Sequence, residues 1–145
     1  MKQQVPVFVY GTLLKGFSNH AQYIQPFAHE AFPAQIKGEL YHLPQGYPGL
    51  IEGTLDIIGT VLYFAPEEYE RALAGLDELE DYYGAGDSRN EYERIMVPAR
   101  RIGMEEEEEV IVYVYRYLNE AYVKRAGIRL VHGDWRRFMR EQQTE

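Results

Sequence analysis

The chain of 145 residues contains no cysteine, which excludes disulfide bonds and thiolate chemistry. Basic side chains are also few, because 15 lysines and arginines face 23 aspartates and glutamates and the net charge is −8. Nucleic acid is therefore an unsuitable partner, since its phosphates need clustered basic side chains. No segment approaches the ~18 apolar residues of a membrane span, and the start of the chain lacks the apolar stretch of a signal peptide. We expect a soluble, cytoplasmic protein with no membrane or nucleic-acid partner.

Motifs for metal sites and for nucleophiles are missing as well. The histidines lack the spacing of a zinc site; they are His20, His29, His42 and His132. The acidic run Glu105 to Glu109 is predicted to be a solvated hairpin tip, because consecutive side chains point apart and do not converge on a cation. There is no G-x-S-x-G motif, and the lysine of "GTLLKG" precedes the second glycine, unlike in a phosphate-binding loop. We expect no metal and no cofactor.

What the sequence does contain is a mixture of strand and helix patterns, with 46% hydrophobic residues, that is typical of one α+β domain over residues 1–145. The patterns predict strands over 5–10, 34–43 (with a bulge at Gly38), 56–64, 92–100 and 109–117, and helices over 17–25, 66–83 and 132–142. Ser18 or Asn19 is expected to cap the first helix, and turn-rich loops are expected over 44–53 and 82–92. Most neighbouring strands can pair antiparallel, so we expect a curved or barrel-like sheet packed on one main helix.

The first strand ends in a glycine loop. After "VPVFV" come Tyr10, Gly11, Thr12 and Leu13. Glycine lets a ligand approach the backbone closely, and successive N–H groups in such a turn can bind a carboxylate. On these residues alone, a plain strand end is the simpler interpretation.

The end of the main helix carries four acids in "GLDELEDYY"; they are Asp77, Glu78, Glu80 and Asp81. On a helical wheel Glu80 falls inside the apolar stripe, whereas Glu78 and Asp81 point to solvent and Asp77 lies at the edge, where it can cap or pair. Burial would raise the pKa of Glu80 toward neutrality, as a proton shuttle requires. The alternative is that the helix ends before residue 80 and lets this side chain turn outward.

Together, "VFVYGTLLKGFSNH", "LDELEDY", "YERIMV" and "VYVYRY" resemble the gamma-glutamylcyclotransferase-like superfamily, most closely its gamma-glutamylamine cyclotransferase branch. The resemblance runs from Val5 to about Tyr117. It implies an α+β fold, with a mixed, largely antiparallel β-barrel flanked by a few helices and one pocket. It also implies that the loop binds the gamma-glutamyl group of the substrate through Tyr10, Gly11, Thr12 and Leu13. The family usually has glycine after its catalytic glutamate, where this chain has Asp81.

The same resemblance implies that Glu80 is the catalytic general acid/base and that Tyr115 is a candidate for the pocket wall. The expected reaction is the cyclisation of a gamma-glutamyl amide or amine to 5-oxoproline with release of the amine, which places the protein among transferases or lyases. Two alternatives stay open: a non-catalytic small-molecule binding module of the same fold, and an enzyme that unmasks a gamma-glutamyl-protected metabolite. The leaving amine is not identified, because variable loops over 44–53 and 84–91 are expected to build that half of the pocket. The oligomeric state is also left open.

Overall fold

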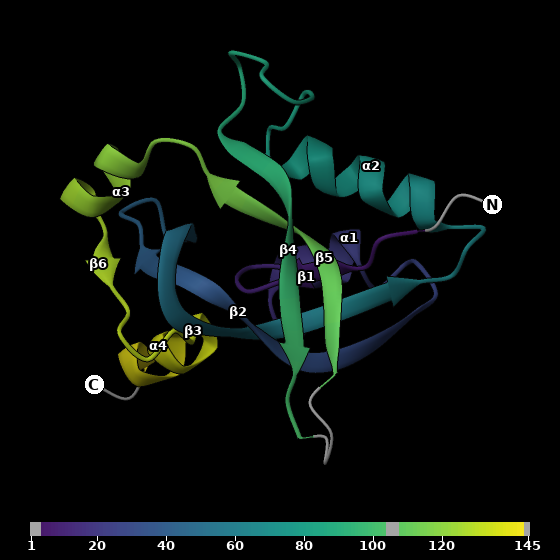
Figure 1. Cartoon of the computed structure of the whole chain (residues 1–145), viewed down its shortest axis with the longest axis horizontal. Coiled ribbons are helices and arrows are strands. Elements are labelled where there is room, and N and C mark those ends of the chain that lie inside the picture. Colours follow the sequence, from purple (N-terminus) through teal and green to yellow (C-terminus); the bar gives the residue numbers. More distant parts are fainter. Residues whose placement is uncertain (1–3, 104–107, 144–145) are drawn as a thin grey trace.

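The computed structural model describes residues 4–103 and 108–143. Along the chain, its elements are β1 (Val7–Val9), α1 (Ser18–Tyr23), β2 (His29–His42), β3 (Pro48–Phe64), α2 (Tyr69–Leu79), β4 (Tyr92–Arg101), β5 (Glu109–Tyr117), α3 (Glu120–Ala126), β6 (Ile128–Arg129) and α4 (Trp135–Gln143). Figure 1 shows the strands wrapping around one another while the helices lie outside them.

Five strands form a closed mixed barrel. Their order is β3-β1-β5-β4-β2, and pairing of β2 with β3 closes the ring, while the short β6 adds to β2. All of these pairings are antiparallel except that of β1 with β5, where Val7 lies opposite Tyr113. The predicted α+β barrel with largely antiparallel pairing is therefore confirmed.

The hairpin of β2 and β3 supplies much of the wall. Its register shifts between Gly38 and Glu39, which confirms the bulge predicted at this glycine. The loop predicted over 44–53 was wrong in its second half, because Pro48 to Gly53 belong to β3. After the bulge, residues 39–42 pair with residues 48–51. This pairing includes residues that the glycines and prolines of 44–53 had indicated to be a loop.

The helix ends differ from the sequence patterns. Phe17, not Ser18 or Asn19, occupies the N-cap of α1, and no side chain caps that helix. The main helix α2 is shorter than the predicted 66–83 at both ends: it begins at Tyr69, and the chain turns left-handed at Asp81 shortly after its last residue. Helix α3 was not predicted; it has seven residues, of which only Val123 is buried, so it carries no apolar periodicity.

The predicted solvated hairpin tip lies partly outside the residues that the structure describes. Residues Glu105 to Glu107 of the acidic run lie outside them, while Glu108 accepts a hydrogen bond from Arg101 at 3.2 Å. Within 4–103 and 108–143, no helix has the length and apolar character needed to cross a membrane.

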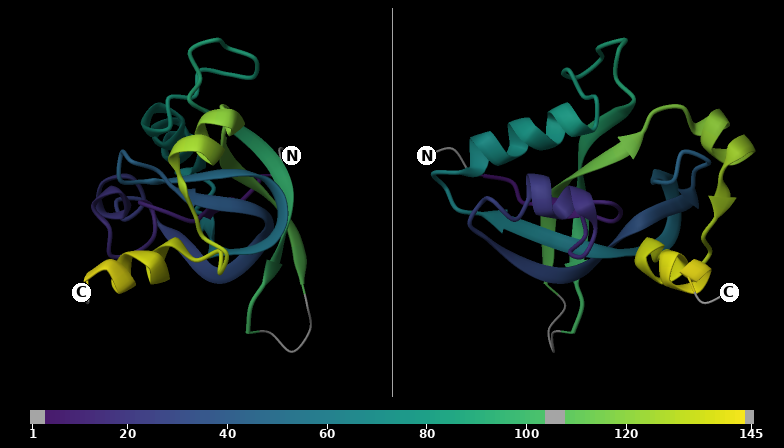
Figure 2. Two further views of the ribbon diagram at one scale, coloured as in Figure 1. Left: turned by 90° about the vertical axis from the view of Figure 1, so that its left-hand side faces the viewer. Right: turned by 180° about the vertical axis from the view of Figure 1, so that it is seen from behind.

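Two apolar cores lie on opposite faces of β5. Tyr115 and Tyr117 contribute to one core, whereas Val112 and Val114 contribute to the other, as expected from the alternation of a strand. The first core lies under α2, and α4 covers the second with the buried Trp135. Figure 2 shows α2 and α4 on different sides of the barrel.

Two glycines of this frame differ in the space around them, and we expect opposite effects from alanine. A Cβ on Gly59 would lie 2.3 Å from the Val9 carbonyl oxygen and 2.6 Å from the Phe8 ring. Gly59→Ala should therefore destabilise the protein by about 1–3 kcal/mol. Gly75 lies inside α2 with its nearest contact at 3.6 Å, so Gly75→Ala should stabilise by about 0.5–1 kcal/mol. Urea unfolding of both variants measures this, and a Gly59→Ala protein as stable as wild type would contradict the close β1–β3 packing.

Candidate active site

A cavity of about 280 Å³ lies where the end of β1 meets the end of α2. Its lining includes all six residues that the sequence analysis singled out: Tyr10, Gly11, Thr12, Leu13, Glu80 and Tyr115. Three segments far apart in the chain therefore meet at one place. The loops expected to build the rest of a pocket also reach it, through Tyr47, Pro48 and Glu91.

A larger cavity of about 880 Å³ lies on the other side of the loop that follows β1. It shares Val9 and Leu13 with the first cavity, and among its other lining residues are Lys15, His20 and His29. It contains no carboxylate side chain in its lining and only one of the six candidate residues. Size alone would favour this cavity, but the convergence of candidate side chains favours the smaller one.

The loop from Tyr10 to Leu13 forms one wall of the smaller cavity. The Tyr10 hydroxyl donates a hydrogen bond to the Tyr115 carbonyl at 2.6 Å, and the Asn19 amide donates to Thr12 Oγ1 at 2.8 Å. Burial raises the pKa of Tyr10 well above its usual value, so this phenol stays neutral. Among the described residues, no hydrogen bond takes the N–H of Gly11, Thr12 or Leu13 as its donor. These N–H groups remain available to a ligand.

Gly11 does not have a positive φ, so the structure does not need glycine here for an unusual backbone angle. Glycine is needed because the loop lies close to a neighbouring residue. A Cβ at this position would lie 2.4 Å from Cγ of Pro48, on the next wall of the cavity. The first residues of β3 therefore lie directly against the loop, and a larger side chain would move one wall or the other.

Glu80 lies just beyond the last residue of α2. The helix ends at Leu79, as in the alternative left open above, yet the side chain does not turn away but lines the cavity. The reason is local: Glu80 keeps a near-helical backbone (φ −86°, ψ 7°), and its N–H still donates to the Leu76 carbonyl at 3.0 Å. The backbone leaves the helical conformation only at Asp81, so the helical wheel still predicts the direction in which the Glu80 side chain points.

The surroundings of Glu80 favour its protonated form. Loss of water around the carboxyl group raises its pKa from 4.5 to about 8, and the neighbouring carboxylates of Glu91 and Asp81 add to the shift. Within residues 4–103 and 108–143, no hydrogen bond reaches this carboxylate, so none of these residues offsets the desolvation in that way. A carboxyl group with a pKa near neutrality can both accept and return a proton.

Asp81 has a left-handed backbone, with φ 51°, and is the only non-glycine residue with positive φ in the described part of the chain. Glycine adopts such angles without strain, and aspartate is among the few other residues that tolerate them. The local turn that a glycine would make is thus preserved. The substitution adds an exposed carboxylate beside Glu80.

Asp77 connects α2 to the barrel. Its carboxylate accepts hydrogen bonds from the Arg94 guanidinium at 2.6 and 2.8 Å and from the Tyr115 hydroxyl at 2.6 Å. The sequence analysis expected Asp77 to cap or pair, and it pairs. Tyr115 contributes to the cavity wall, but its hydroxyl is already engaged by Asp77.

Four further lining residues were not singled out as site residues from the sequence, although Tyr47 and Glu91 lie in the loops expected at the pocket; they are Asn19, Tyr47, Glu91 and Tyr92. The Tyr47 hydroxyl donates to Glu91 at 2.5 Å, and the Tyr92 hydroxyl donates to the Pro48 carbonyl at 2.8 Å. Each of these bonds spans 44 residues of chain, so no local sequence signal could have predicted it.

Comparison with known proteins now identifies the family. A family model described as "Gamma-glutamyl cyclotransferase, AIG2-like" matches residues 7–137. The chain belongs to this family. A protein of Niallia circulans named "Gamma-L-glutamyl-butirosin B gamma-glutamyl cyclotransferase" is 39% identical over 89 residues, which are 61% of this chain and 54% of that protein. A putative gamma-glutamylcyclotransferase of Vibrio cholerae is 43% identical over 75 residues, or 52% of this chain and 61% of that protein. The match thus spans between half and two thirds of these curated relatives.

Solved structures support the fold. An AIG2-like protein from mouse superposes with a TM-score of 0.63 at 20% identity, covering 92% of this chain and 88% of that chain. An uncharacterised protein from Pyrococcus horikoshii gives a TM-score of 0.65 at 19% identity, covering 97% and 98%. The AIG2-like proteins therefore share this barrel.

The raised pKa of Glu80 can be measured directly. In a ¹³C NMR titration, the Glu80 carboxyl should titrate near pH 8, and Glu91→Gln should lower that pKa because one repelling carboxylate is removed. Stability gives a second readout. Because the folded-state pKa lies above the ordinary 4.5, the contribution of Glu80 to stability falls as the pH rises from about 4.5 to 8.

The variant Glu80→Gln cannot ionise and should lose this part of the pH dependence. Urea unfolding between pH 5 and 8.5 should therefore show the variant gaining stability relative to wild type as the pH rises. The exposed Glu78 on the same helix gives a matched control, Glu78→Gln, which should follow the wild-type slope. Titration of Glu80 near pH 4.5 would contradict the desolvated site.

Proposed function

We propose that this protein is a gamma-glutamyl cyclotransferase that converts a gamma-glutamyl amide or amine to 5-oxoproline and releases the amine, with Glu80 as general acid/base. The observation that carries the proposal is the desolvated carboxyl group of Glu80, with its pKa of about 8, in one cavity with the Tyr10–Leu13 loop. Membership of the cyclotransferase family supports it. The proposed chemistry needs no cofactor.

The reaction is an internal acyl transfer. The α-amine of the gamma-glutamyl group attacks its own γ-carbonyl carbon, a new C–N bond closes the five-membered lactam, and the bond to the leaving amine breaks. The α-nitrogen loses two protons as it changes from an ammonium to the lactam N–H, and the leaving nitrogen gains two as it changes from an amide N–H to an ammonium, so the proton count balances without a co-reactant. Holding the chain folded supplies proximity, which contributes up to about 7–11 kcal/mol in oriented intramolecular reactions.

The cavity offers one group for each task. In the proposal the unused N–H groups of Gly11, Thr12 and Leu13 bind the α-carboxylate and the developing oxyanion. Glu80 takes the proton from the α-ammonium and returns it to the leaving nitrogen. The buried phenols of Tyr10 and Tyr115 are neutral because desolvation raises their pKa values, so they shape the wall without adding charge.

Two other functions are compatible with the fold. A binding module without turnover would not need a carboxyl group of raised pKa inside its pocket, and Glu80 therefore favours the enzyme. Removal of a gamma-glutamyl group from a protected metabolite uses the same chemistry, and the name of the Niallia circulans relative favours it as a second candidate. Incubation with a panel of gamma-glutamyl amines and dipeptides, with 5-oxoproline followed by mass spectrometry, distinguishes an enzyme from a binding module.

Glu80→Gln should keep the fold and bind ligand, but it should lower kcat at least ~10²-fold, the usual contribution of a general acid/base. The control Glu78→Gln changes the same charge outside the cavity and should stay within a few-fold of wild type. The measurement is 5-oxoproline production from one gamma-glutamyl amine. A fully active Glu80→Gln enzyme would refute the mechanism.

Gly11→Val should abolish ligand binding while the protein stays soluble, because even a Cβ collides with the Pro48 ring and the loop must then leave its place. Isothermal titration with a gamma-glutamyl amine on the Glu80→Gln background separates binding from turnover. Gly75→Ala, a glycine substitution outside the cavity lining, is the control. Wild-type affinity in a folded Gly11→Val protein would remove this loop from the proposed site.

A further inference from the structure

The larger cavity, of about 880 Å³, takes no part in the proposed reaction. It lies where the loop after β1 and helix α1 meet strands β2 and β3, and Figure 2 shows α1 and this loop against the wall of the barrel. Pockets of this size hold small organic molecules in many proteins. The chain therefore has room for a second ligand, separate from the gamma-glutamyl group.

The charged lining of the larger cavity is basic, although the whole chain carries a net charge of −8. Lys15 supplies one positive charge, and the lining contains no aspartate or glutamate. His20 and His29 also line it, with their ring centres 6.1 Å apart. Burial lowers the pKa of His20, and the positive charges of His29, Lys15 and Arg136 lower it further. A bound anion would offset this repulsion.

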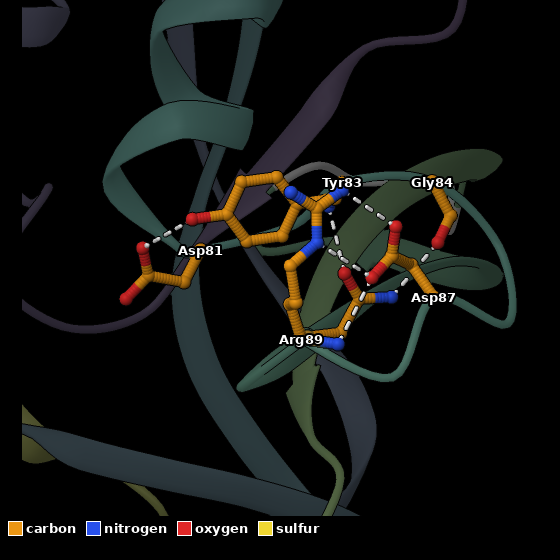
Figure 3. A network of polar contacts seen from close by, with 6 residues as sticks. Asp81, Tyr83, Gly84, Asp87 and Arg89 are labelled. Atoms are coloured by element: carbon orange, nitrogen blue, oxygen red, sulfur yellow. Dashed lines mark hydrogen bonds and ion pairs between the residues drawn. The ribbon is translucent and has the colours of Figure 1, made fainter.

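Lys15 and Arg136 form no ion pair in the part of the chain that the structure describes. The Arg136 guanidinium instead lies 5.8 Å from the centre of the Phe17 ring, which lines the cavity. By contrast, Figure 3 shows an arginine that an acid does hold: Arg89 pairs with Asp87 at 2.8 Å. No acid of the lining therefore neutralises the positive potential at the larger cavity.

The rest of the lining is mainly apolar. Leu14, Phe17 and Leu62 contribute side chains to it. The His29 ring is fixed, because its Nδ1 donates to the Phe27 carbonyl at 2.7 Å, which leaves Nε2 for a ligand. A cation beside apolar surface suits a small molecule that has both an anionic and an apolar part.

We propose that the larger cavity binds an organic monoanion, a carboxylate with an apolar chain, whose head pairs with Lys15 and whose chain packs against Leu14, Phe17 and Leu62. One negative charge is expected, because Lys15 is the one permanent cation among the described lining residues. His20 does not add a second full charge near neutral pH, since its pKa lies below the usual value.

The burial of the lining gives the direction of binding. Lys15 is exposed, whereas Leu14 and Leu62 are buried. The charged head therefore stays near solvent while the chain points inward, so the carboxylate is not desolvated away from its partner. Leu13 lines both cavities, so this anion shares a wall with the gamma-glutamyl site. Its binding does not require the proposed reaction.

Octanoate is the probe, and three molecules that each change one of its features are the comparisons. Octanol lacks the charge, octylammonium reverses it, and acetate lacks the chain. In isothermal titration, octanoate should bind at least about tenfold more tightly than any of them, because each loses the charge-assisted contact or the buried methylenes. Similar affinities for octanoate and octanol would show an unselective apolar surface and overturn the inference.

The variant Lys15→Gln should weaken octanoate binding about fivefold or more and leave octanol binding unchanged, because only the charge is removed. Lys15 is exposed, so the variant should fold. The matched control is Lys124→Gln, which removes an exposed lysine of α3 that lines neither cavity, and it should bind octanoate like wild type. Wild-type octanoate affinity in Lys15→Gln would contradict the assignment.

Methyl NMR decides which cavity is occupied, since the candidate active site is itself proposed to bind a carboxylate. Octanoate should shift the signals of Leu14 and Leu62, which line the larger cavity, more than those of Leu79, which lines only the smaller one. If all three shift alike, loss of the Leu14 and Leu62 shifts in Lys15→Gln supports the second site, and their persistence refutes it. Shifts confined to Leu79 would place octanoate in the candidate active site and refute the proposal, as would an absence of binding by every probe.

Discussion

The contact between Asp77, Arg94 and Tyr115 is the constraint on which the site depends. It ties the last turn of α2 to the neighbouring strands β4 and β5, and the guanidinium also lies 4.7 Å from the centre of the Tyr113 ring. The ion pair is only 19% and 24% exposed, so removing one partner would leave a desolvated charge, which typically costs about 3–5 kcal/mol. Glu80 follows Asp77 by three residues. Its place at the cavity is therefore fixed by an ion pair that does not itself line the cavity.

The electrostatics of the site depend on its acids and on burial. Asp77 pairs with Arg94, Asp87 pairs with Arg89, and neither arginine lines the cavity. Desolvation, together with the carboxylates of Glu91 and Asp81, raises the pKa of Glu80 to about 8. The pKa that suits Glu80 to proton transfer therefore follows from its burial and from the acids on both sides of the loop 81–91.

Those features of the fold and of the candidate site that depend on neighbouring residues could be predicted from the sequence. The alternation of tyrosine and valine gave the two faces of β5, Gly38 marked the bulge, and the helical wheel gave the direction of Glu80 although the helix is shorter than predicted. The rest depends on long-range pairing. The pairing of residues 39–42 with residues 48–51 prevailed over the turn signals within 44–53. The contacts of Glu91 with Tyr47 and of Asp77 with Arg94 join segments whose sequences give no sign that they meet.

Asp81 shows how one position serves two purposes. A left-handed turn is required there, because a further helical residue would carry the chain past the cavity instead of into the loop 81–91 that returns to β4. Glycine would make that turn with no side chain. Aspartate makes the turn with some strain and adds a carboxylate beside Glu80, which raises the pKa of the neighbouring acid and increases the negative charge at the mouth. The barrel thus carries the Tyr10–Leu13 wall of the cavity, while the turn at Asp81 and the loop 81–91 set the negative charge of the opposite part of its lining.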